Sequence, residues 1–170
     1  MNNYTWKHIV LQPSDLPKKA QQFIEMMDID MSHIRLMTLR PCPDGKFFKS
    51  FDNGELGKSI HSWAAIAELN AIYFFSDSVK VGTAIHALTH IYLTLSRLNG
   101  IEYDLRGMGE MFIKENGASA LTFYAQASTY SNAWEEVICE IVATYGRRGQ
   151  FNKIKELFNQ QLQQSNEGEI

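Results

Sequence analysis

Apolar residues recur at helical spacing in several parts of the chain, and the clearest case covers residues 81–98. This stretch is apolar on nearly every side, and it ends at Asn99 and Gly100, a pair that commonly terminates a helix. A helix that is apolar all round is a buried helix. We therefore predict that residues 81–98 form a helix in the core.

The same pattern analysis predicts a mixture of helices and strands along the rest of the chain. Further helices are expected at residues 15–27, 58–69, 118–127, 132–145 and 150–164. Alternating apolar positions predict a strand at 33–40, and a short apolar, aromatic run predicts another at 71–75. Proline, glycine, asparagine and aspartate predict loops at 41–57 and 101–112. Several helices around a few strands indicate an α+β fold.

Length and composition indicate one domain and exclude some classes of function. A chain of 170 residues with 45% hydrophobic residues can bury a core of its own. Its formal net charge of -3 comes without any Lys/Arg block, which makes nucleic acid an unfavourable partner. No apolar run is long enough for a membrane span or a signal peptide, so we expect a cytoplasmic protein. The two cysteines, Cys42 and Cys139, are expected to be reduced thiols.

Two histidines in the predicted buried helix are the first candidates for chemistry. His86 and His90 lie four residues apart, which places both imidazoles on one face, one turn from each other. This arrangement lets both rings reach a single metal ion. Spacing alone leaves open the alternative that both are core histidines whose hydrogen bonds are satisfied without a metal.

Carboxylates in the helix predicted at 132–145 could complete such a site. Glu136 and Glu140 share one face of this helix, and Glu135 precedes them. The same turns carry core residues, so solvated carboxylates, the alternative interpretation, explain the pattern less well. One carboxylate could bind the metal, and the other could hold the outer nitrogen of a ligand histidine.

The stretch HALTHIYLTLSRLNG, residues 86–100, resembles the metallopeptidase domain of the ArdC antirestriction family, whose helix reads HELGHWTGH followed directly by SRLN. Downstream, WEEVICEIVATY, residues 134–145, is similar to the family's EELVAEIGA helix. The upstream stretch AIYFFSDSVKV resembles the strand and turn that precede the family's helix. The chain is accordingly divided into an unassigned N-terminal part, a metallopeptidase core and a C-terminal helix, at residues 1–60, 65–148 and 150–164.

The resemblance implies a zincin-like fold and a bacterial or mobile-element metallopeptidase that acts on a protein or peptide substrate. It implies that zinc is held by His86, His90 and Glu136, with Glu140 bracing a histidine, although the two glutamates could exchange roles. Tyr130 or Tyr124 could donate a hydrogen bond to an oxyanion formed during hydrolysis.

The departures from the family pattern are as informative as the matches. Ala87 stands where the family has its general-base glutamate, and a methyl group cannot take a proton from metal-bound water. Thr94 stands at the family's third histidine. Three interpretations follow: a peptidase disarmed by a Glu-to-Ala change, a zincin-like pseudoenzyme that binds and inhibits a host defence protein, or a metal-free interaction domain. Arg97 is expected to brace the fold through Asp104 or a helix end.

Overall fold

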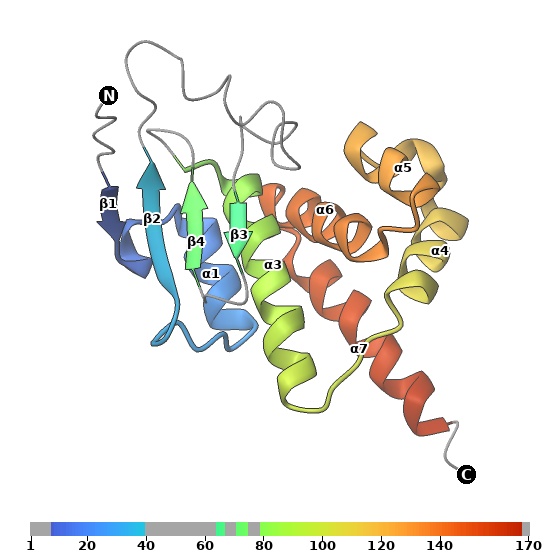
Figure 1. Ribbon diagram of the computed structural model, residues 1–170. Helices are drawn as coiled ribbons and strands as arrows, with labels where there is room; N and C mark the ends of the chain where they lie inside the picture. The colour runs from blue at the N-terminus through green and yellow to red at the C-terminus, as the bar shows by residue number, and fades with distance from the viewer. Residues whose placement is uncertain (1–7, 40–63, 67–70, 75–78, 168–170) are drawn as a thin grey trace.

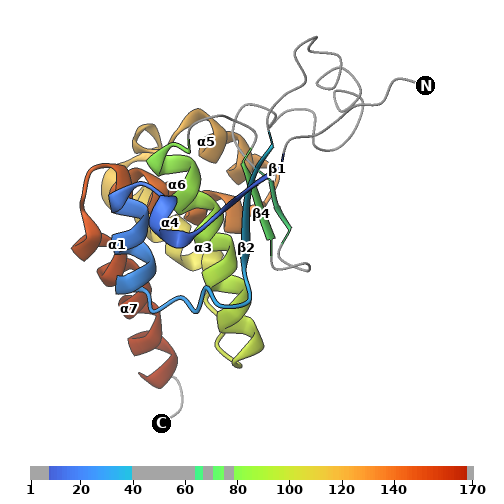
Figure 2. The same cartoon turned by 90° about the vertical axis from the view of Figure 1, so that its left-hand side faces the viewer.

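A computed structural model of the chain describes residues 8–39, 64–66, 71–74 and 79–167. These residues form a small sheet with helices packed against it, which confirms the α+β fold class (Figure 1). The helix α3 lies between the sheet and α6, and α1 lies on the same side of the sheet as α3 (Figure 2). The contact between α3 and α6 therefore forms the centre of the described structure.

The sheet has four strands in the order β1-β2-β4-β3. Its strands are β1 His8–Leu11, β2 Arg35–Leu39, β3 Ala64–Ile66 and β4 Ala71–Phe74. The central pair, β2 and β4, is parallel, and both outer pairs are antiparallel. Leu36 lies opposite Ile72 in the parallel pair, and both are buried together with Phe74. Because alternate residues of a strand share a face, these side chains form the sheet's contribution to the core.

Six α-helices and two short 3-10 helices account for most of the remaining described residues. The helices are α1 Lys18–Met26, α3 Val81–Leu98, α4 Leu105–Asn116, α5 Phe123–Tyr130, α6 Trp134–Arg147 and α7 Phe151–Glu167, with η1 at Pro13–Asp15 and η3 at Ala118–Ala120. Gly146 of α6 lies directly on Ile85 of α3, with no room for a Cβ atom between them. This glycine permits the close approach of the two central helices.

Several predicted elements are confirmed. The helix α3 has the predicted bounds, and the strands β2 and β4 fall within the predicted ranges. The helices α6 and α7 each begin and end within three residues of the predicted positions. Cys139 is a free thiol, as expected, and is fully buried. The predicted loop at 41–57, with Cys42, lies outside the described residues. No described helix is both long and apolar enough to cross a membrane.

The predicted loop at 101–112 is wrong, because residues from Leu105 onward form α4. The carboxylate of Asp104 accepts a hydrogen bond from the backbone N–H of Gly107 at 2.9 Å and so caps the helix. Gly109 faces α6, where a Cβ atom would lie 2.6 Å from Cε3 of Trp134. The glycines that suggested a loop serve helix capping and close packing instead.

Three further helix predictions need correction. Residues 64–66 of the helix predicted at 58–69 form the strand β3, which pairs with β4, so tertiary pairing overrides the local pattern there. The helix predicted at 15–27 begins only at Lys18, because Asp15 belongs to η1 and accepts the N–H of Gln12. The helix predicted at 118–127 is divided into η3 and α5.

Candidate metal centre

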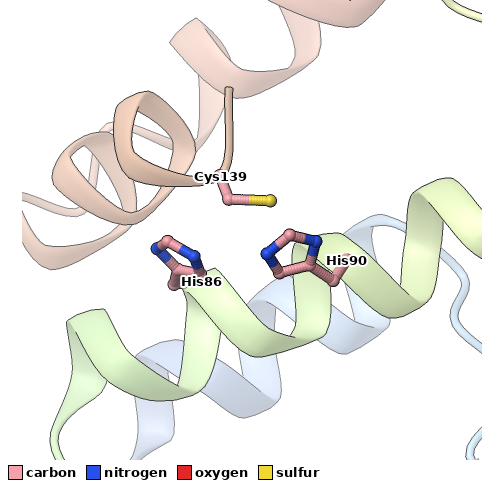
Figure 3. Close-up of side chains that lie close together, drawn as sticks. All are labelled: His86, His90 and Cys139. Atoms are coloured by element: carbon pink, nitrogen blue, oxygen red, sulfur yellow. The ribbon is translucent and has the colours of Figure 1, made fainter. Parts of the chain in front are cut away.

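The facing sides of α3 and α6 bring together a cluster of imidazole, carboxylate and thiol groups. The two imidazoles come from α3, and their ring centroids are 5.2 Å apart. Their inner nitrogens point toward each other, with the sulfur of Cys139 close to both rings (Figure 3). The cluster consists of His86, His90, Glu135, Glu136, Cys139 and Glu140. Helical spacing on two helices is enough to place all six side chains in one small volume.

Glu136 occupies the centre of the cluster and contacts both histidines. One of its oxygens lies 3.1 Å from Nε2 of His86, and the other lies 2.9 Å from Nε2 of His90. The phenol of Tyr124 donates a further hydrogen bond of 3.0 Å to the same carboxylate. Burial, reinforced by this carboxylate, raises the pKa of Tyr124 to about 12, so the phenol remains a donor at neutral pH.

The outer nitrogens of the two histidines each face a different carboxylate. Nδ1 of His86 lies 2.9 Å from Glu140, and Nδ1 of His90 lies 2.9 Å from Glu135. Glu140 also accepts a hydrogen bond from the hydroxyl of Thr122 at 3.1 Å, and Glu135 pairs with Arg97 at 3.0 Å. Both imidazoles are therefore held in orientation from the side that faces away from Glu136.

The cluster carries a net negative charge when both imidazoles are neutral. Three carboxylates and one guanidinium, that of Arg97, sum to -2. Two imidazoles that donate from both nitrogens would balance this charge, and so would two neutral imidazoles with one divalent cation. A largely buried site strongly favours such a balance, because an unpaired charge costs several kcal/mol away from water.

Electrostatic coupling within the cluster shifts several pKa values. Burial acts to raise the pKa of Glu136, but the hydrogen bonds from His86 and His90 outweigh this effect, so the net shift of the pKa is downward. Burial acts to lower the pKa of His90, but its bonds with Cys139, Glu135 and Glu136 raise it well above the ordinary histidine value. Burial raises the pKa of the Cys139 thiol to about 11. In the absence of a metal, the cluster therefore contains an ionised Glu136, a protonated His90 and a protonated Cys139 thiol.

The distances within the cluster are suitable for a metal ion. In tetrahedral zinc sites with bonds of about 2.0–2.1 Å, neighbouring N and O ligand atoms lie roughly 3.3 Å apart. The two contacts of Glu136 with the inner nitrogens, 3.1 and 2.9 Å, are made by its two different oxygens and are ion-pair distances close to this value. Ligand atoms of His86, His90 and Cys139 also lie within 4.8 Å of one another. These N, O and S donors fit a divalent transition metal.

The structure brings four of the predicted site residues together and leaves two outside the cluster. The four are His86, His90, Glu136 and Glu140. The side chain of Ala87 is fully buried in the core. Tyr130 is 91% exposed, and no hydrogen bond within the described residues connects it to the cluster. Tyr124, the other tyrosine considered, is the one in contact with Glu136.

Neither the position of Cys139 at the cluster nor the partner of Arg97 was predicted from the sequence. Cys139 follows Glu136 by three residues and precedes Glu140 by one, so helical spacing could have placed the thiol on the ligand face. Arg97 pairs with Glu135 instead of Asp104, whose carboxylate caps α4. Arg97 thus links the end of α3 to the start of α6.

Comparison of the chain with models of known protein families, with curated proteins and with solved structures found no significant match. The chemistry of the cluster is therefore the ground for assigning a function.

Proposed function

We propose that this chain is a zincin-like zinc-binding protein that does not hydrolyse peptides and acts by binding a protein partner. Zinc would be held between α3 and α6 by Nε2 of His86, Nε2 of His90 and the carboxylate of Glu136. The observation that carries the proposal is the position of this carboxylate across both inner nitrogens, while Glu140 and Glu135 hold the two outer nitrogens.

The alternative of two core histidines without a metal explains this arrangement poorly. A buried neutral imidazole needs only one acceptor and one donor, whereas each of these rings faces a carboxylate at both nitrogens. Three carboxylates in a largely buried cluster need a matching charge, so without a metal both imidazoles would have to be protonated. A carboxylate on the outer nitrogen is a common feature of histidines that bind metal, because it orients the ring and increases its basicity.

Zinc is the ion that this donor set favours. Imidazole nitrogens and a carboxylate form many zinc sites, and three protein ligands of this kind are typical of zinc peptidases. When bound, zinc would supply Lewis-acid chemistry to a water or a carbonyl group. The residues of the chain would orient the ligands, with Tyr124 donating a hydrogen bond to Glu136.

Peptide hydrolysis also needs a general base, and the cluster offers none that is uncommitted. Ala87 has no proton acceptor, and its side chain is fully buried. Glu135 is engaged by His90 and Arg97, while Glu140 is engaged by His86 and Thr122. For this reason we propose that the metal centre stabilises a protein that binds a partner protein and does not cleave peptides.

Exposed aromatic side chains beside the centre support a role in protein binding. Phe123 and Tyr130 of α5 are 92% and 91% exposed, and Tyr124 on the same helix is 52% exposed while contacting Glu136. Aromatic residues are enriched at protein interfaces, and three of them on one short helix exceed what a solvated surface requires. A host defence protein, as the ArdC resemblance suggests, is the class of partner that we propose.

Metal analysis tests the zinc site directly. After treatment with chelator, dialysis and reconstitution with zinc, the full chain should retain one zinc ion per molecule. His86→Ala and His90→Ala should retain less than a tenth of this amount. His33→Ala is the matched control, because His33 is exposed and outside the cluster, and it should bind like the unmodified chain. A folded, unmodified chain without stoichiometric zinc would refute the proposal.

A peptidase disarmed by the Glu-to-Ala change at Ala87 is the second candidate, and it is favoured by the retention of a full ligand set around one missing base. Ala87→Glu, loaded with zinc, should cleave a peptide library if this candidate is right, whereas the unmodified chain should not.

Binding is tested by capturing partners on immobilised protein. A partner retained by the unmodified chain and lost by Phe123→Ala with Tyr130→Ala supports the binding function, and cleavage by the unmodified chain contradicts it.

A further inference from the structure

We propose that the thiolate of Cys139 is a fourth ligand, so that the metal is enclosed by four protein donors and has no open position for water. The donors would be Nε2 of His86, Nε2 of His90, the carboxylate of Glu136 and Sγ of Cys139. This inference rests on the proposed metal site and makes it a closed, structural site.

The position of the thiol relative to the two rings carries the inference. Ligand atoms of Cys139, His86 and His90 all lie within 4.8 Å of one another, and the sulfur is close to the inner nitrogens (Figure 3). In a tetrahedral zinc site, with a Zn–S bond of about 2.3 Å, sulfur and nitrogen ligands are roughly 3.6 Å apart. A small inward movement of the thiol would complete this geometry.

Burial distinguishes this cysteine from an incidental neighbour. Cys139 has no exposed surface and lies within the helix pair that supplies the other donors, one turn from Glu136. Its sulfur lies beside the two imidazoles, with ligand atoms of all three residues within 4.8 Å of one another (Figure 3). A thiol beside two imidazoles is placed as zinc ligands are.

The chemical step is a simple exchange of a proton for a metal bond. The S–H bond of Cys139 breaks and the sulfur lone pair forms the metal–sulfur bond, while any proton on Nε2 of His86 or His90 leaves as that nitrogen binds the metal. These protons pass to solvent, and nothing is oxidised or reduced. With neutral histidines, three carboxylates, one thiolate, Arg97 and a divalent cation, the net charge of the cluster is -1. The side chains of Glu135 and Glu136 retain 31% and 27% exposure, so water can solvate this charge.

A closed site is consistent with the absence of a general base. Zinc that catalyses hydrolysis keeps one position open for water, and a neighbouring base activates that water. In this chain Ala87 removes the base, and Cys139 would fill the open position. Both features prevent hydrolysis. Without a base, a bound water is not activated, and without an open position, no water binds the metal.

Cobalt substitution of the full chain tests the fourth ligand. Co²⁺ bound to a thiolate gives a near-ultraviolet charge-transfer band, and four-coordinate Co²⁺ gives strong visible bands. We expect both in the unmodified chain at one equivalent of Co²⁺, and we expect azide to leave the visible bands unchanged. Cys139→Ser should lose the near-ultraviolet band. Its affinity for Co²⁺ should also fall by more than the roughly 10- to 100-fold loss that removal of an outer partner causes.

Cys42→Ser is the matched control, because Cys42 is the only other cysteine in the chain. This variant should keep the near-ultraviolet band. Cys139→Ala, with its circular dichroism compared with that of the unmodified chain, separates loss of a ligand from loss of folding. Stoichiometric Co²⁺ without the charge-transfer band would overturn the fourth ligand and leave the proposed zinc site intact, as would visible bands that shift with azide. Absence of bound metal in the unmodified chain would overturn both.

Discussion

Substitution of Glu140 by Gln isolates the contribution of the carboxylate behind His86. In the unmodified chain, Nδ1 of His86 lies 2.9 Å from the carboxylate of Glu140. Glutamine keeps the shape of this side chain and can still present an oxygen to Nδ1, but it removes the negative charge. Outer partners of ligand histidines are worth roughly 10- to 100-fold in metal affinity. We therefore expect Glu140→Gln to weaken zinc binding by this factor, which corresponds to about 1.4–2.7 kcal/mol.

Thermal and chemical unfolding give the same quantity through linkage. At a free zinc concentration of 1,000 times the dissociation constant, binding stabilises the unmodified chain by about 4.1 kcal/mol. At the same zinc concentration, a variant that binds 100-fold more weakly would keep about 1.4 kcal/mol of this stabilisation. Urea unfolding with and without buffered zinc measures both values, and competition with a chromophoric chelator measures the affinity directly.

The matched control is Glu156→Gln, which removes a carboxylate from an exposed pair with Lys153 at 3.7 Å on α7. This variant should change neither zinc affinity nor the zinc-dependent stabilisation. A folded Glu140→Gln variant whose zinc affinity stays within threefold of the unmodified chain would show that this carboxylate does not support a metal ligand.

Three other predictions concern packing and charge in the metal-free chain. Arg97→Met should lower the free energy of unfolding by no more than about 1 kcal/mol in urea, because the pair with Glu135 is partly exposed; a larger loss would contradict this estimate. Gly109→Ala should cost about 1–3 kcal/mol, since the added methyl group meets Trp134, and an unchanged melting temperature would contradict the close packing. The folded-state pKa of Glu136 is lowered, so its contribution is present above its ordinary pKa of 4.5 and is lost as the pH falls through the folded-state pKa. Unfolding midpoints from pH 6 to pH 3 should therefore decline, and Glu136→Gln should reduce this decline.

Local sequence was sufficient for elements whose pattern reflects burial alone. The helix α3 is apolar all round, and its bounds were predictable because burial and the terminal Asn99-Gly100 pair act within the segment itself. The predicted site residues on α3 and α6 also came together, because spacing along each helix determines which side chains share a face.

Elements that depend on a distant partner were not predictable in this way. The glycines of α4 indicate a loop locally, but Gly109 is explained by the ring of Trp134 on another helix. Strand β3 forms because β4 pairs with it, a contact that the pattern at 58–69 does not contain. The position of Cys139 at the cluster was not predictable for the same reason. A cysteine in an apolar helix is usually a core residue, and only the packing of α6 on α3 places its sulfur beside two imidazoles.

The absence of a side chain at Gly146 lets α6 approach α3 closely. Its direct contact with Ile85 fixes the separation of the two helices one residue before His86 and therefore fixes the gap between imidazole and carboxylate donors. A methyl group at this position would overlap Cδ1 of Ile85, so that side chain or the helices would have to shift. In the proposed metal site, a wider separation of the two helices would favour an ion larger than zinc.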